Sequence, residues 1–177
     1  MAILRIRTFG DPVLRERARE VERITDVHHK LIKDMFDTMR DAPGVGLAAP
    51  QVGVLERIFV WEFEDESGVF INPEIVERSG KAEDGEEGCL SLPGIVGPVD
   101  RSYEVVVEGL DEDGEPFRIE ASDWVARIFQ HEIDHLDGVL FIDHLPEALK
   151  KEALSTLRDQ ALGLRSTAPP APPGESL

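Results

Sequence analysis

Long apolar runs, cysteine and positive charge are all scarce in this chain of 177 residues. No run approaches the roughly 18 apolar residues that a membrane-spanning helix needs. The single cysteine, Cys89, excludes an intramolecular disulfide and favours a reducing compartment. Only 19 Lys and Arg residues stand against 36 Asp and Glu, which gives a net charge of −17. Such an acidic surface repels phosphate backbones, which argues against nucleic acid as the substrate.

The remaining composition indicates one folded domain. Hydrophobic residues make up 41% of the chain, and its length is sufficient to bury a core. The first residues, MAILRIRTFGDP, are too short in apolar length for a signal peptide and are interrupted by Arg5 and Arg7. We therefore expect a cytoplasmic protein with one catalytic or binding domain over residues 1–165. The proline-rich end, STAPPAPPGESL, predicts a disordered tail over residues 166–177.

Apolar spacing predicts three helices and several short strands. Apolar residues every four positions over residues 25–40 predict an amphipathic helix capped by Thr25 or Asp26. Two further helices are expected over residues 122–136 and 146–164. Strands are predicted at residues 57–63, 69–72, 75–78, 103–110 and 115–120. Because polar turns join them as hairpins, we expect an α+β fold, with antiparallel sheets around a central helix and a C-terminal helix.

The segment QHEIDHLDG, which starts at Gln130, carries the most chemically informative spacing. Successive helical residues are rotated by about 100°, so His131, Glu132 and His135 point to one side of the predicted central helix. The same rotation places Arg127 and Gln130 on its polar side. Two imidazoles four residues apart, next to a carboxylate, are typical of a metal site. The alternative is a pair of core histidines that are hydrogen-bonded to carbonyl groups.

The residue that completes the ligand set decides the class of protein. A metzincin protease would have a histidine where this chain has Phe141. A thermolysin-like protease would use a downstream glutamate, for which Glu147 and Glu152 are candidates. Upstream, Cys89 lies in GEEGCLSLPG, where Glu87 could orient a metal ligand. A thiolate with two imidazoles leaves a fourth position open to water, as catalytic metal sites do. The alternative for Cys89 is a small buried apolar residue.

Three motifs, taken together and in order, resemble the signatures of the peptide deformylase family. GVGLAAPQ at residues 44–51 matches GxGLAAxQ, and EGCLS at residues 87–91 matches the second signature. QHEIDHLDG at residues 130–138 matches QHExDHLxG. The resemblance spans roughly residues 3–150, and three motifs in register are far more specific than any one of them.

The resemblance implies a metal-dependent hydrolase. Such an enzyme removes the formyl group from N-formylmethionine at the N-terminus of newly synthesised polypeptides and releases formate. It implies that Cys89, His131 and His135 bind one divalent ion, natively iron(II), with zinc, nickel or cobalt as substitutes. Ligand type alone would favour zinc, so the expectation of iron comes from the family.

The resemblance also implies roles for other residues. Glu132 would take a proton from water and return it to the leaving amine. The side-chain amide of Gln51 and the backbone N–H of Leu90 would stabilise the developing oxyanion. The substrate backbone would pair with the glycine-rich loop, and its methionine would enter an apolar pocket. The expected substrate-binding residues are Gly44, Val45, Gly46, Trp124 and Ile128.

Two arginines lie outside the three motifs. Arg127 belongs to the polar side of the predicted central helix, and we expect it at the rim of the methionine pocket. Arg101 is either a partner of Glu87 or a surface charge.

Two alternatives remain open on the sequence alone. One is a zinc peptidase that uses a downstream glutamate and is indifferent to Cys89. The other is a non-catalytic domain whose metal only stabilises the fold and whose final helix binds the ribosome. A transient ribosome contact through that helix is also an expectation for the enzyme, which would have no membrane partner and no nucleic-acid substrate. The basic residues in and beside the final helix are Lys150, Lys151, Arg158 and Arg165.

Overall fold

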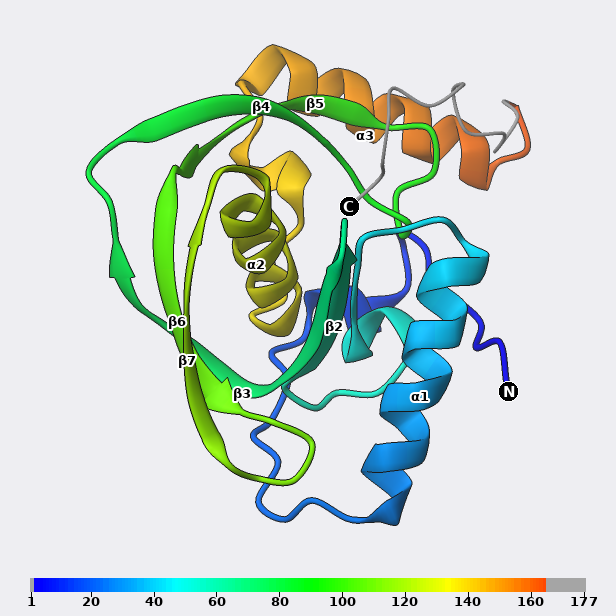
Figure 1. The fold of residues 1–177 in the computed structure, drawn as a ribbon. Coiled ribbons are helices and arrows are strands. Elements are labelled where there is room, and N and C mark those ends of the chain that lie inside the picture. The colour runs from blue at the N-terminus through cyan, green and yellow to red at the C-terminus, as the bar shows by residue number, and fades with distance from the viewer. Residues whose placement is uncertain (1, 165–177) are drawn as a thin grey trace.

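The computed structural model describes residues 2–164, and the tail predicted over residues 166–177 lies outside them. Two antiparallel sheets surround the helix α2, and two further helices pack outside (Figure 1). The α-helices are α1 (Asp26–Asp41), α2 (Asp123–Leu136) and α3 (Glu147–Ala161). The strands are β1 (Gly46–Ala48), β2 (Ile58–Phe63), β3 (Glu66–Arg78), β4 (Ala82–Gly88), β5 (Val96–Ser102), β6 (Glu104–Leu110) and β7 (Pro116–Ser122). Short 3₁₀ helices are η1 (Pro12–Arg15), η2 (Ala49–Val52) and η3 (Phe141–His144).

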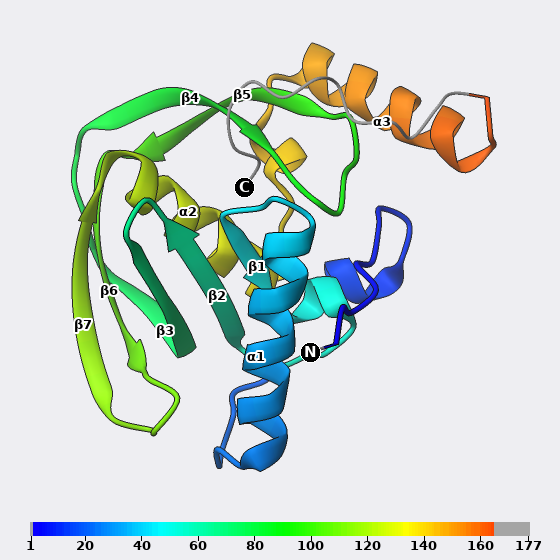
Figure 2. The ribbon, with the colours of Figure 1, turned by 45° about the vertical axis from the view of Figure 1, so that its right-hand side comes forward.

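The larger sheet has the strand order β1-β2-β3-β6-β7, and β4 pairs with β5 in a second sheet. All of these pairs are antiparallel. The larger sheet curves around α2, while α1 lies against its outer side beside β1 and β2 (Figure 2). The predicted α+β fold, with antiparallel sheets around a central helix and a C-terminal helix, is therefore confirmed.

Side chains along β2 point alternately to the two faces of the sheet, so this strand contributes to two hydrophobic clusters. Phe59 and Trp61 point toward α2, where they pack with Phe129. Ile58 and Val60 point the other way and belong to the core that α1 covers. Because both faces of the strand are covered, its apolar run is continuous instead of alternating with polar residues.

The predicted solvent-facing position of Arg127 and Gln130 is wrong, because most of α2 is buried. Arg127 and Gln130 are 5% and 2% exposed. The Gln130 side chain donates to the carbonyl of Ser102 at 2.9 Å and accepts from its N–H at 3.1 Å. Arg127 donates to the carbonyl oxygens of Glu83 and Val99 at 2.8 and 2.7 Å. Polar groups on α2 thus bond to the backbone of β4 and β5 in place of water.

The two strands predicted at residues 69–72 and 75–78 are one continuous strand, β3. Its register against β6 shifts between Ile71 and Glu74, where Asn72 has a positive φ of 53°. The Asn72 side chain accepts from the N–H of Val21 at 2.8 Å and donates to its carbonyl at 3.0 Å. The polar residue therefore bends the strand without ending it.

Strands β4 and β5 were not predicted, because their sequences have little apolar alternation. β4 reads AEDGEEG, and its residues pair with β5 through backbone groups from Ala82 to Gly88. Gly85 allows a close approach to α2, since a Cβ there would lie 2.6 Å from the guanidinium of Arg127. Within residues 2–164, no helix has both the length and the apolar character needed to cross a membrane.

Replacing Gly138, which lies just after α2, should destabilise the protein. Its φ is 74°, and a Cβ would lie 2.6 Å from the carbonyl oxygen of Arg15. Left-handed backbone and overpacking together predict that Gly138→Ala lowers the free energy of unfolding by about 2–4 kcal/mol. Gly163→Ala is the matched control, because its φ is 70° with no atom within 4 Å of the added carbon. Urea unfolding should show a clearly smaller loss for the control, and equal losses would contradict the packing argument.

Candidate metal centre

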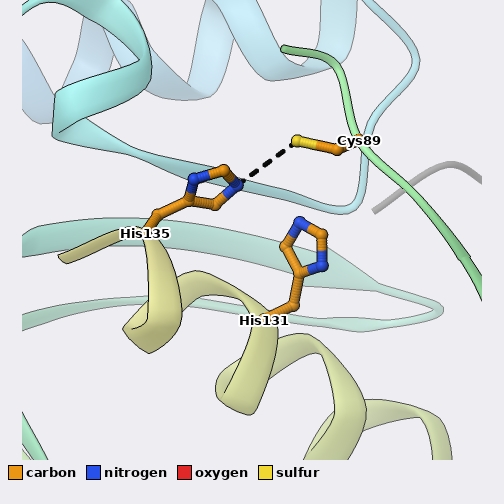
Figure 3. Close-up of side chains that lie close together, drawn as sticks. All are labelled: Cys89, His131 and His135. Carbon is orange, nitrogen blue, oxygen red and sulfur yellow. Dashed lines mark hydrogen bonds between the residues drawn. The ribbon is translucent and has the colours of Figure 1, made fainter. Parts of the chain in front are cut away.

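Cys89, His131 and His135 converge from two elements that are far apart in the sequence (Figure 3). The cysteine follows β4, and the histidines occupy successive turns of α2. One ligand atom from each lies within 4.8 Å of the others, and all three residues are buried. The Cys89 sulfur is 3.3 Å from Nε2 of His135, and the two ring centroids are 5.0 Å apart.

This donor set fits one divalent metal ion. Tetrahedral binding by a thiolate and an imidazole would separate sulfur from nitrogen by about 3.6 Å, close to the observed spacing. Nε2 of His131 is buried and has no hydrogen-bond partner among the described residues. Sulfur and imidazole ligands suit zinc, iron, nickel and cobalt. Across residues 2–164, no other group of three His, Cys, Asp or Glu residues gathers in this way, and Glu147 and Glu152 are exposed on α3.

Glu87 orients the first of these histidines. It is 1% exposed, and its Oε2 lies 3.0 Å from Nδ1 of His131. Burial raises the pKa of Glu87, but the hydrogen bonds from His131 and Arg101 outweigh it and hold the pKa well below its ordinary value. The ionised carboxylate can only accept, so Nδ1 of His131 carries a proton and Nε2 is the ring nitrogen left for a metal ion.

The surroundings shift the pKa values of the two histidines in opposite directions. Burial lowers the pKa of His135 well below its ordinary value, so this ring is neutral and ready to bind a metal. Burial also lowers the pKa of His131, but the nearby Cys89 sulfur and Glu87 carboxylate raise it well above its ordinary value. Metal binding at this centre must therefore release protons.

Two arginines complete the surroundings of Glu87. Arg101, which the sequence left undecided, donates from Nε and Nη2 to the Glu87 carboxylate at 2.8 and 3.1 Å. Arg127 donates to the same carboxylate at 3.2 Å and is buried, so it does not face solvent as its place on the predicted polar side required. A helical wheel could not reveal this, because the acceptor lies on β4. The sequence feature that pointed to this contact was the acidic residue Glu87, two positions before the cysteine.

Glu132 is fully buried, and neither of its carboxylate oxygens has a hydrogen-bond partner in the described part of the chain. Burial raises the pKa of Glu132 to about 7. Gly46 of β1 lies so close that a Cβ there would overlap the Glu132 carboxylate. An unpartnered carboxylate with a pKa near neutrality can both take and return a proton.

Gln51 points its amide at the same centre. Its Oε1 accepts from the N–H of Ala48 at 2.9 Å, which fixes the orientation of the side chain. Its Nε2 then lies 3.6 Å from the Cys89 sulfur and 3.2 Å from Oγ of Ser91. Ser91 was not identified from the sequence as a neighbour of Gln51. Leu90 follows the cysteine directly and packs beside Gly44, where a Cβ would meet its side chain at 2.8 Å.

The predicted substrate-binding residues fall into two groups. Gly44, Val45 and Gly46 lead into β1, which forms one edge of the larger sheet. Val45, Trp124 and Ile128 belong to one apolar cluster beside α2, with Ile128 fully buried and Trp124 partly buried. The structure therefore places an edge strand and an apolar cluster next to the helix that carries His131 and His135.

Replacing Glu87 by glutamine should weaken metal binding. Glu87→Gln keeps the shape but removes the charge that orients His131, and loss of such a partner typically costs 10–100-fold in metal affinity. Competition with a chromophoric chelator measures this loss. Glu86→Gln, on the exposed side of the same strand, should bind metal like the wild type. An unchanged affinity in Glu87→Gln would contradict the orienting role.

Glu132 should make the metal-free protein less stable at high pH. Its folded pKa of about 7 exceeds the unfolded value of about 4.3. The unfolded chain therefore loses this proton first, and stability falls as the pH rises through that window. Glu132→Gln removes the effect, so its stability relative to the wild type should improve by about 2–3 kcal/mol between pH 5 and pH 8. Urea unfolding at both pH values tests this, and a constant difference would contradict it.

Comparisons with known proteins agree with this geometry. A family model described as polypeptide deformylase matches residues 3–151. The peptide deformylase of Acidothermus cellulolyticus is 50% identical over 159 residues, which cover 90% of this chain and 88% of that protein. That of Clostridium botulinum is 56% identical over 143 residues, covering 81% and 97%.

Solved structures give the same result. A peptide deformylase from Legionella pneumophila superposes with a TM-score of 0.86 at 43% identity, covering 93% of this chain and 99% of that one. One from Synechococcus elongatus, in complex with actinonin, gives 0.84 at 40% identity, covering 95% and 91%. The chain therefore belongs to the peptide deformylase family of metal-dependent hydrolases.

Proposed function

We propose that Cys89, His131 and His135 bind the metal ion with which this enzyme removes the formyl group from N-formylmethionine. The substrate is the N-terminus of a newly synthesised polypeptide, and the products are formate and a free amine. The observation that carries the assignment is the unpartnered, buried carboxylate of Glu132 beside a buried cluster of one sulfur and two imidazoles. That arrangement supports Glu132 as a proton acceptor next to the proposed metal site and not as one of its ligands.

The proposed ion is iron(II), with zinc, nickel or cobalt as substitutes. When bound, a divalent ion supplies positive charge that polarises a carbonyl group and makes water more acidic. The chain contributes three neutral or anionic donors and a buried setting that strengthens their interaction with a cation.

Glu132 is the proposed proton carrier. It takes a proton from the water whose oxygen attacks the formyl carbon. It then returns a proton to the amine nitrogen as the carbon–nitrogen bond breaks. Its raised pKa, about 7, supports both steps near neutral pH.

Gln51 and Leu90 are the proposed donors to the developing oxyanion. The amide of Gln51 is held by Ala48, so its Nε2 is aimed before the reaction starts. Leu90 follows Cys89 directly in the chain, which supports a role for its backbone N–H at the same centre. Donors that are already oriented stabilise a new negative charge without reorganisation.

Gly44, Val45 and Gly46 are the proposed backbone contacts of the substrate, which would extend the larger sheet at β1. The methionine side chain would contact the apolar cluster that contains Val45, Trp124 and Ile128. Backbone pairing does not depend on substrate side chains, which suits an enzyme that acts on many different N-termini.

We further propose a cytoplasmic location and a transient ribosome contact through α3. Exposed Lys151 and Arg158 on this helix support the contact. Lys151 lies near Glu147, which offsets part of its charge.

Formate release from a formyl-methionyl peptide, measured with protein purified without oxygen, tests the proposed function. Glu132→Gln should retain one metal ion per chain and lose about 10²–10⁴-fold in turnover, as expected when a proton carrier is removed. Cys89→Ala should lose both metal and turnover, and Glu86→Gln should behave like the wild type.

The alternatives predict different results. A peptidase with a downstream glutamate would cleave internal peptide bonds and tolerate Cys89→Ala. A non-catalytic metal domain would release no formate although its metal is bound. Either result would contradict the proposed function.

A further inference from the structure

Asp134 lies inside QHEIDHLDG, yet the proposed chemistry gives it no task. Its Oδ2 accepts from Nη1 of Arg101 at 2.7 Å and from Nε2 of His144 at 2.8 Å. The Asp134 side chain is 22% exposed and that of His144 is 39% exposed. Two donors from β5 and η3 thus converge on one carboxylate oxygen at the surface end of a buried network.

Arg101 connects this surface carboxylate to the metal centre. While Nη1 binds Asp134, Nε and Nη2 of the same guanidinium bind Glu87. A guanidinium is planar and rigid, so fixing one of its nitrogens fixes the direction of the other two. Glu87 in turn lies 3.0 Å from Nδ1 of His131. The chain of contacts from Asp134 to His131 is therefore continuous.

The charges along these contacts are balanced. Glu87 forms ion pairs with Arg101 and Arg127, and Asp134 forms one with Arg101. Without the charge on Asp134, Arg101 would bind Glu87 alone and draw its negative charge away from His131. Glu87 would then polarise the imidazole less, and His131 would be a weaker ligand.

We propose that Asp134 is a positioning residue of the metal centre, which holds Arg101 in the orientation that fixes Glu87 on Nδ1 of His131. This inference rests on the proposed assignment of His131 as a metal ligand. His144 supports Asp134 from the solvent side and is the outermost member of the network.

Asp134→Asn in the full-length chain tests the inference, because it keeps the shape and removes the charge. The affinity for zinc, measured by competition with a chromophoric chelator, should fall by about tenfold. Asp137→Asn is the matched control: Asp137 pairs with Arg57 at 2.9 Å at the end of the same helix and contacts neither Glu87 nor His131. This control should bind zinc like the wild type, even where both variants lose similar thermal stability.

A double-mutant cycle separates positioning through Glu87 from a general structural effect. In a Glu87→Gln background, Asp134→Asn should cause no further loss of zinc affinity, because the residue through which it acts has already lost its charge. Arg101→Lys should resemble Asp134→Asn, since a lysine cannot bind both carboxylates with a fixed fork.

The outcomes are distinguishable. Wild-type affinity in Asp134→Asn, a loss equal to that of Asp137→Asn, or additive losses with Glu87→Gln would overturn this inference while leaving the metal centre in place. A wild-type chain that binds no metal at all would overturn the proposed function and this inference together.

Discussion

The burial of one ionised carboxylate, Glu87, is the constraint on which the rest of the site depends. Removing a carboxylate from water costs several kcal/mol unless other charges and donors replace the water. Here the replacement comes from Arg101 on β5 and from Arg127 and His131 on α2. Because the donors belong to both elements, satisfying this charge also joins the second sheet to the central helix. The strand that directly precedes Cys89 is thereby held against the helix that carries the two imidazoles.

The same principle explains why α2 can be buried on nearly all sides. A helix enclosed by two sheets would normally be apolar all round. This helix instead carries a row of polar residues that bond to strand backbone and to one buried acid, while its opposite face packs on Phe59 and Trp61. Polar contacts fix its rotation and its position along the axis more strictly than apolar packing alone would, since each hydrogen bond has a direction.

Local features of the fold could be predicted from the sequence, and features that depend on distant partners could not. The helix α2 and the hairpin of β6 and β7 follow from spacing within a short window, and both were predicted. β4 carries almost no apolar alternation, because backbone pairing and Arg127 hold it in place. The wheel of α2 was misread for the same reason: it assumes one solvent face, whereas the partners of Arg127 and Gln130 are strands. That the three motifs share one centre followed from family resemblance and not from spacing.

Gly46 allows β1 to pack directly against the Glu132 carboxylate. With only a hydrogen atom between the backbone and the carboxylate, neither can shift without the other responding. A peptide that lengthens the sheet at this edge would press on the strand and so set the location of the acidic group behind it. In the proposed mechanism, peptide docking at β1 and the placement of the Glu132 carboxylate would then be coupled, and a loosely held peptide would leave that carboxylate slightly displaced.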